Sequence, residues 1–140
     1  MNLTLNVTKI QFIYDEGDTN AINFILDDNG YFSIQIGVYL EEGDHPSLNQ
    51  PIFEFKDQGD SQSGGIEEIH FSEKKIILTF RDSDLFLKKY KTVELLLDQP
   101  LNRKMVDFFA NHLFLGEIIR YDIGFKESNK VIQTEHRELL

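Results

Sequence analysis

The chain has 140 residues and a formal net charge of −10, and its hydrophobic fraction of 41% suits one globular domain with a buried core. It contains no cysteine, so disulfides, thiolate zinc sites, iron–sulfur clusters and cysteine nucleophiles are excluded. Twelve Phe and five Tyr, without Trp, indicate a β-rich core in which aromatic rings fill the space between layers.

The negative charge is distributed unevenly along the chain. Residues 1–70 hold thirteen acidic residues against only Lys9 and Lys56, whereas residues 71–140 hold eleven acidic residues against twelve basic ones. An acidic surface repels nucleic acid and anionic lipid, because both are bound through Lys and Arg. It attracts cationic surfaces and speeds encounter with them. We therefore expect the protein to bind a cationic protein partner and to bind neither nucleic acid nor membranes. The alternative is that the acidic residues only keep the protein soluble.

Alternating hydrophobic residues predict a series of strands in the first half of the chain. In residues 3–14 the alternation changes parity after Val7, which indicates one long strand with a bulge or two short strands. Asn29-Gly30 then joins the alternating segments 22–26 and 32–38 and predicts a hairpin. The same pattern predicts further strands at residues 52–55, 66–71, 76–80, 93–97 and 119–125.

Polar and turn-forming residues separate these strands. Residues 40–51, with two prolines and a glycine, and residues 57–65 are predicted to be polar loops. Residues 82–91 are ambiguous, since Asp82 or Ser83 could cap a single turn of helix there.

One amphipathic helix is predicted, at residues 99–115. Asp98 is a suitable N-cap, Pro100 is tolerated in the first turn, and Gly116 is a suitable C-terminal cap. The hydrophobic face repeats with the helical period of 3.6 residues. The predicted fold is α+β, a mostly antiparallel sheet of about seven or eight strands with this helix on one face. Residues 1–125 are expected to form the single domain and residues 126–140 a polar tail that frays.

The sequence shows no motif for catalysis, cofactor binding or metal binding. The four histidines (His45, His70, His112 and His136) have no metal-ligand spacing. No nucleophile elbow, phosphate-binding loop or dinucleotide fingerprint occurs. The acidic turns at residues 15–18 and 27–30 lack the spacing of a calcium loop and are better explained as hairpin turns. We expect no enzymatic activity, no cofactor and no metal.

Acidic residues gathered in two loops are the functional signal that remains. Over residues 41–60 six acidic residues face only Lys56. If both loops lie at one end of the sheet, they form a negative patch able to bind a cationic partner. The candidate partner-binding residues are Glu41, Glu42, Asp44, Asp57 and Asp60.

Residues 33–97 resemble the immunity-protein-10 family of bacterial polymorphic-toxin systems. The segments that carry the resemblance are residues 33–36 (Ser-Ile-Gln-Ile), 41–44 (Glu-Glu-Gly-Asp), 52–55 (Ile-Phe-Glu-Phe), 62–69 (Gln-Ser-Gly-Gly-Ile-Glu-Glu-Ile) and 75–80 (Lys-Ile-Ile-Leu-Thr-Phe). Ser63 stands where the family pattern has an aromatic residue, and the chain after Gly116 extends beyond that pattern. The resemblance implies a cytoplasmic antitoxin that binds and blocks a cognate toxin domain without catalysis.

Three functions are therefore open at this point. The first is the immunity protein, which binds a cationic toxin domain through its acidic loops. The second is a small hydrolase or sugar-binding protein that uses paired carboxylates in a cleft. The third is an assembly protein that forms a homodimer through an exposed strand edge. The N-terminal residues have neither a basic region nor a long apolar run, so we expect no signal peptide and a cytoplasmic location.

Overall fold

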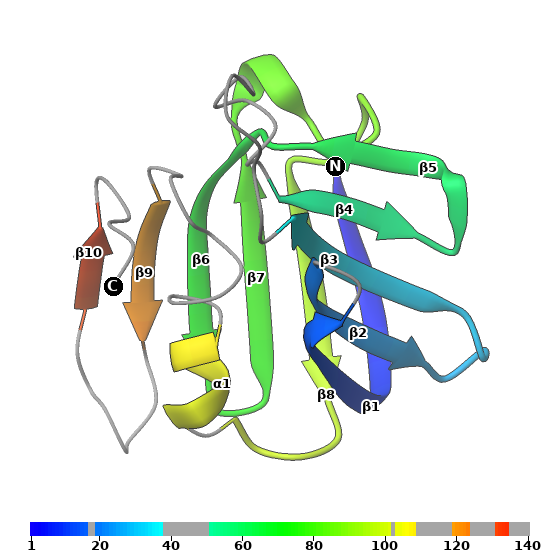
Figure 1. Cartoon of the computed structure of the whole chain (residues 1–140). Helices are drawn as coiled ribbons and strands as arrows, with labels where there is room; N and C mark the ends of the chain where they lie inside the picture. The colour runs from blue at the N-terminus through cyan, green and yellow to red at the C-terminus, as the bar shows by residue number, and fades with distance from the viewer. Residues whose placement is uncertain (17–18, 38–50, 102, 109–118, 124–130, 135–140) are drawn as a thin grey trace.

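A computed structural model describes residues 1–16, 19–37, 51–101, 103–108, 119–123 and 131–134. Ten strands form one sheet in the order β10-β9-β6-β7-β8-β1-β2-β3-β4-β5 (Figure 1). The strands are β1 (Asn2–Glu16), β2 (Thr19–Leu26), β3 (Tyr31–Gly37), β4 (Ile52–Phe55), β5 (Asp57–Ser63), β6 (Ile66–Ser72), β7 (Lys75–Phe80), β8 (Thr92–Leu97), β9 (Ile119–Ile123) and β10 (Val131–Thr134). The helices among the described residues are the short 3₁₀ helix η2 (Asp82–Asp84) and α1 (Arg103–Phe108).

Most neighbouring strands pair antiparallel. Among the described strands, only β1 with β8 and β6 with β9 run parallel. The structure therefore confirms the predicted α+β class with a mostly antiparallel sheet, and the described residues contain one short α-helix. The sheet has ten strands instead of seven or eight, because β5 and β10 were not recognised from the sequence.

The long first strand contains the predicted bulge. Its register with β2 shifts between Val7 and Lys9, so one extra residue, Thr8, lies between two regular stretches of pairing. Leu5 and Val7 are buried before the bulge, and Ile10 packs against the core after it. The extra residue explains why the hydrophobic parity reverses in the sequence.

The first predicted hairpin is also confirmed. β2 and β3 pair antiparallel through to Ile25 and Tyr31. The amide of Leu26 donates to the carbonyl of Gly30, and the amide of Asn29 donates to the carbonyl of Leu26. Asn29 has φ = 67°, so it provides the left-handed residue that closes the turn.

Aromatic side chains from distant strands fill the core. Phe53 on β4 contacts Phe80 on β7 with ring centroids 5.0 Å apart, and Phe32 on β3 contacts Phe86 at 5.7 Å. All four side chains are completely buried. Because β4 and β7 lie far apart in the strand order, these contacts require the sheet to curl so that its two halves face each other, as Figure 1 shows.

The helix is shorter at its N-terminal end than predicted. Residues 98–101 are not helical, so Asp98 is not the N-cap and Pro100 lies before the helix. The amide of Leu101 donates to the carbonyl of Glu73 at 2.7 Å, which ties this segment to the β6–β7 turn. Of the predicted hydrophobic face, Met105 and Phe108 lie on α1 and are buried in the core, together with Val106. The predicted C-terminal half of the helix and its Gly116 cap fall outside the described residues.

Two segments predicted to be irregular are strands. The polar loop expected at residues 57–65 contains β5, which pairs antiparallel with β4. The polar tail expected from residue 126 contains β10, which pairs antiparallel with β9. In residues 82–91 a single turn of 3₁₀ helix forms, but its N-cap is Arg81 and no side chain caps it.

No helix in the described part of the chain is long and apolar enough to cross a membrane.

Candidate functional site

The structure describes two of the five predicted partner-binding residues. Asp57 and Asp60 lie on β5, and both are exposed to solvent. The Asp57 carboxylate accepts a hydrogen bond from the amide of Gly59 at 2.9 Å. Glu41, Glu42 and Asp44 lie outside the described residues, so their position relative to β5 stays a prediction.

Asp60 belongs to an open hollow beside β5. The hollow has a volume of about 670 Å³ and is lined by residues 60–62 of β5 and by residues 82–85, 87 and 88 of the connection after β7. Three exposed carboxylates (Asp60, Asp82 and Asp84) and one ammonium (Lys88) lie around it. We call this feature the acidic hollow. Its excess of negative charge is concentrated where two parts of the curled sheet approach each other.

Gln62 joins the two walls of the acidic hollow. Its side-chain amide nitrogen donates to the Asp84 carbonyl at 3.2 Å, and its side-chain oxygen accepts from the Leu87 amide at 2.9 Å. One carboxamide thus pairs with the main chain of the opposite wall as a peptide group would. This bridge holds β5 and the 82–88 segment at a fixed separation.

Gly65 makes this close approach possible. Its φ of +89° is in the left-handed region, and a Cβ atom added there would lie 2.9 Å from the Asp84 Cβ. Any larger residue would be strained and would displace the wall that carries Asp84. The Gly64-Gly65 pair noted in the sequence therefore has a structural role at the acidic hollow.

The opposite wall is anchored by one buried aromatic residue. Phe86 is completely buried and stacks on Phe80 with ring centroids 5.3 Å apart. Its main chain pairs with Tyr90 in an isolated antiparallel bridge. Between them Leu87 and Lys88 have φ of 53° and 61°, values that residues other than glycine seldom adopt. The tight turn and the Phe86 anchor fix the backbone position of this wall.

Lys91 neutralises part of the negative charge of the acidic hollow, although it does not line the hollow itself. Its ammonium lies 3.0 Å from the Asp82 carboxylate and 3.2 Å from Glu67. The hydrogen bond to Asp82, followed by the contact with Glu67, raises the pKa of Lys91. Asp82 is thus shared with a neighbouring cation.

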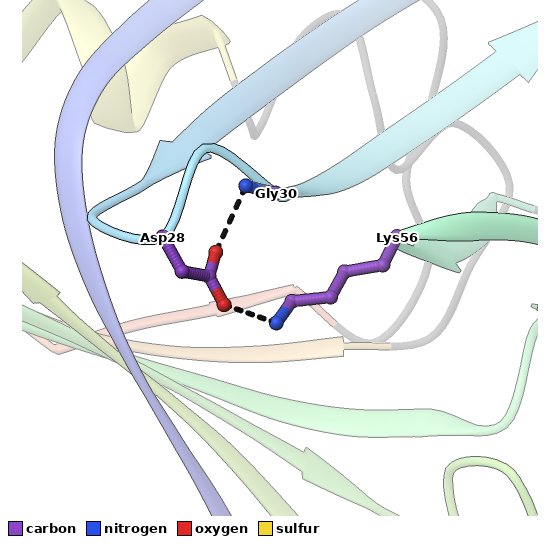
Figure 2. A network of polar contacts seen from close by, with 3 residues as sticks. All are labelled: Asp28, Gly30 and Lys56. Carbon is purple, nitrogen blue, oxygen red and sulfur yellow. Dashed lines mark hydrogen bonds and ion pairs between the residues drawn. The ribbon is translucent and has the colours of Figure 1, made fainter.

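A second polar cluster joins the turn at residues 27–30 to Lys56. The Asp28 carboxylate contacts the Lys56 ammonium and accepts from the Gly30 amide at 2.8 Å (Figure 2). Both hydrogen bonds lower the pKa of Asp28, with Lys56 the larger cause. A Cβ atom at Gly30 would lie 2.7 Å from Cε of the Lys56 side chain, so a larger residue there would require this side chain to shift. The acidic turn at residues 27–30 is therefore a hairpin turn, as the sequence indicated.

A shallow polar groove of about 370 Å³ lies on the outer face of β2, β3 and β4. Within it the Tyr31 hydroxyl donates to the Glu54 carboxylate at 2.5 Å, and the Gln35 amide donates to the buried Ser33 hydroxyl at 2.9 Å. The hydrogen bond to Glu54 is the main cause that raises the pKa of Tyr31 to about 12.

We predict that one tyrosine titrates well above the usual pKa of about 10. Because the folded pKa is raised, the Tyr31–Glu54 bond contributes stability below about pH 10 and loses it as the pH rises through about 12. Absorbance titration of tyrosinate, with Tyr31→Phe to assign the signal, measures this directly. Glu54→Gln should lower the pKa toward 10, whereas the distant Glu73→Gln should not. A Tyr31 signal near pH 10 in the unmodified protein would contradict this geometry.

Among the residues that the structure describes, no group of three or more His, Asp or Glu side chains is placed to hold a metal ion. No protein-family model matches the chain, and no curated protein or solved structure is significantly similar to it. The resemblance to immunity proteins therefore rests on the residues quoted above.

Sequence reasoning identified Asp60 but missed Asp82, Asp84 and Gln62. Asp82 and Asp84 lie in the half of the chain whose charges balance, next to Arg81 and Lys88, so a local count shows no excess. Only the curl of the sheet brings them to the acidic β5. Gln62 has no local signal, because its partners are 22 and 25 residues away in the chain.

Proposed function

We propose that this protein is a cytoplasmic immunity protein that binds a cognate, cationic toxin domain and so neutralises it without catalysis. The observation that carries the proposal is the acidic hollow, where Asp60, Asp82 and Asp84 surround one open depression. It agrees with the acidic first half of the chain and with the function that the resemblance implies.

The physical basis of the proposal is charge complementarity. Toxin domains that act on nucleic acid bind phosphates through Lys and Arg, and such a surface is attracted to clustered carboxylates. Long-range attraction raises the association rate, and close ion pairs then slow dissociation. A protein that must intercept a toxin soon after synthesis benefits from both effects.

The environment of the described carboxylates favours binding over acid–base catalysis. The buried polar side chains of the described residues are Asn20 and Ser33, and every described Asp and Glu whose side chain is placed is exposed or half-buried. General acid catalysis by a carboxyl group depends on burial that keeps its proton near neutral pH. Carboxylates at the surface are accessible to the basic side chains of a partner.

Co-expression tests the function. If a large secreted protein is encoded next to this gene, its C-terminal domain is the toxin to test. Expressed alone in the cytoplasm, that domain should arrest growth, and co-expression of this protein should restore it. A catalytically inactive toxin variant should still bind this protein, as purification of the complex would show. Growth arrest that persists with abundant, folded protein, and no complex with the inactive domain, would overturn the proposal.

Charge reversal in the first acidic loop extends the test to residues outside the described part of the chain. Glu41→Lys/Glu42→Lys should weaken toxin binding by at least about tenfold, or roughly 1.4 kcal/mol, because the loop is predicted to contribute to the same negative surface. Asp27→Lys/Glu73→Lys is the matched control, with the same change in net charge at exposed turns. Titration calorimetry with the inactive toxin domain gives both affinities. Equal affinities for the two variants would show that this loop takes no part.

A further inference from the structure

The strand that carries Asp57 and Asp60 lies at the border of the sheet. β5 is the last strand in the order, and among the described residues no strand pairs with its outer edge (Figure 1). The amide of Gly64 donates to the carbonyl of Pro51 at 2.8 Å, and Ser63 is opposite Ile52 in the register. Hydrogen-bonded and non-bonded pairs alternate along an antiparallel ladder. The main-chain N–H and C=O of Ser63 therefore point away from β4, toward the outer edge.

The acidic hollow lies between β5 and the wall formed by residues 82–88. In the described structure this wall approaches β5 through the Gln62 side chain, without a main-chain ladder between the two. An exposed strand edge is a template for a further strand, because its main chain offers a row of donors and acceptors. The carboxylates of the acidic hollow add a preference for positive charge.

We propose that the partner adds an extended segment rich in Lys or Arg to the outer edge of β5, and that its basic side chains enter the acidic hollow. This inference rests on the proposed function and specifies how the toxin domain is held. The charge argues against a second copy of this chain as the occupant. Two β5 strands side by side would bring Asp57 and Asp60 against the same acidic residues, in a protein of net charge −10.

A defined peptide tests the inference without the toxin. The probe is an acetylated and amidated Arg-Thr-Arg-Thr-Arg-Thr hexapeptide, in which arginine supplies the charge and threonine favours the extended conformation. At saturating peptide, the amide of Ser63 should shift in the NMR spectrum and exchange with solvent at least about tenfold more slowly. The same peptide N-methylated on every residue keeps its charge, but none of its residues has a main-chain N–H to donate to the edge of β5, so it should bind at least about tenfold more weakly.

Variants of the protein provide the matching control. Ser63→Pro removes the outward amide at an edge position, where proline is tolerated, and should weaken binding of the hexapeptide at least about tenfold. Ser63→Ala removes only the hydroxyl and should change the affinity less than about twofold. Circular dichroism and thermal unfolding confirm that both variants fold.

Each outcome bears on one proposal. No binding of the arginine peptide, equal binding of its N-methylated form, equal binding to Ser63→Pro, or self-association through β5 would overturn the strand addition. A toxin domain that is neutralised equally well by Ser63→Pro would overturn it while leaving the proposed function intact. If the hexapeptide adds to β5 but this protein protects against no toxin domain, the proposed function would be overturned and the strand addition would stand.

Discussion

Replacing Phe86 with alanine is expected to lower the free energy of unfolding by about 3–5 kcal/mol, the usual cost of truncating a buried phenylalanine. Phe86 is completely buried and has ring contacts with Phe32, Phe53 and Phe80 at centroid distances of 5.7, 6.4 and 5.3 Å. These partners come from strands in both halves of the curled sheet. Alanine would leave a cavity at the point where the two halves meet, and a close-packed core relaxes only partly into such a space.

Urea denaturation followed by circular dichroism and fluorescence measures the effect of Phe86→Ala. Phe12→Ala is the matched control, because Phe12 is 47% exposed and contacts the ring of Phe108 at the periphery. It should cost about 1 kcal/mol or less. Similar losses for the two variants would show that Phe86 does not join the halves of the sheet. A stable Phe86→Ala protein would also show that the wall of the acidic hollow has another anchor.

Reversing two charges in the acidic hollow is expected to weaken toxin binding by at least about a hundredfold, or roughly 2.8 kcal/mol. Asp60→Lys/Asp84→Lys turns two attractions for a cationic partner into repulsions. The hydrogen bond from Gln62 uses the main-chain carbonyl of Asp84, so the substitution leaves that bridge in place. Asp82 is not chosen, because it already pairs with Lys91 at 3.0 Å and its reversal would disturb that contact.

The control for this pair is again Asp27→Lys/Glu73→Lys, which makes the same change in net charge. Asp27 and Glu73 are exposed in the β2–β3 and β6–β7 turns. These turns lie at the end of the sheet where β7 begins, whereas the acidic hollow follows the end of β7. Binding to the inactive toxin domain should therefore fall much less for the control pair. Equal losses would mean that only the net charge matters, and unchanged binding of Asp60→Lys/Asp84→Lys would exclude the acidic hollow as the binding surface.

The hydrophobic pattern predicted the strands with a buried face but not β5. Every residue of β5 is polar or glycine, because a strand at the border of the sheet buries little of either face. Its pairing depends on β4 and on the tertiary contact through Gln62, neither of which leaves a period-two signal. The bulge in β1 was predictable because it reverses the parity of buried residues around Thr8.

The helix boundary shows a different limit of sequence reasoning. Asp98 and Pro100 are favourable at a helix N-terminus, but the Leu101 amide bonds to the Glu73 carbonyl in the β6–β7 turn instead. A tertiary hydrogen bond thus outweighs the local capping preference. The sequence predicted only part of the candidate site, because tertiary structure also determines which carboxylates lie together. A count of charges along the chain located Asp60, whereas the partners Asp82 and Asp84 reach it only through the curl of the sheet.

The association rate constant between this protein and the inactive toxin domain, measured as a function of salt, shows whether clustered carboxylates capture the toxin. We expect this rate constant to fall at least about tenfold between about 0.01 M and 1 M salt, as the Debye length shortens from about 30 Å to 3 Å. The Asp60→Lys/Asp84→Lys variant should associate slowly and show a much weaker dependence. An association rate that does not change with salt, or that is the same in this variant, would contradict the proposal that clustered carboxylates capture a cationic toxin.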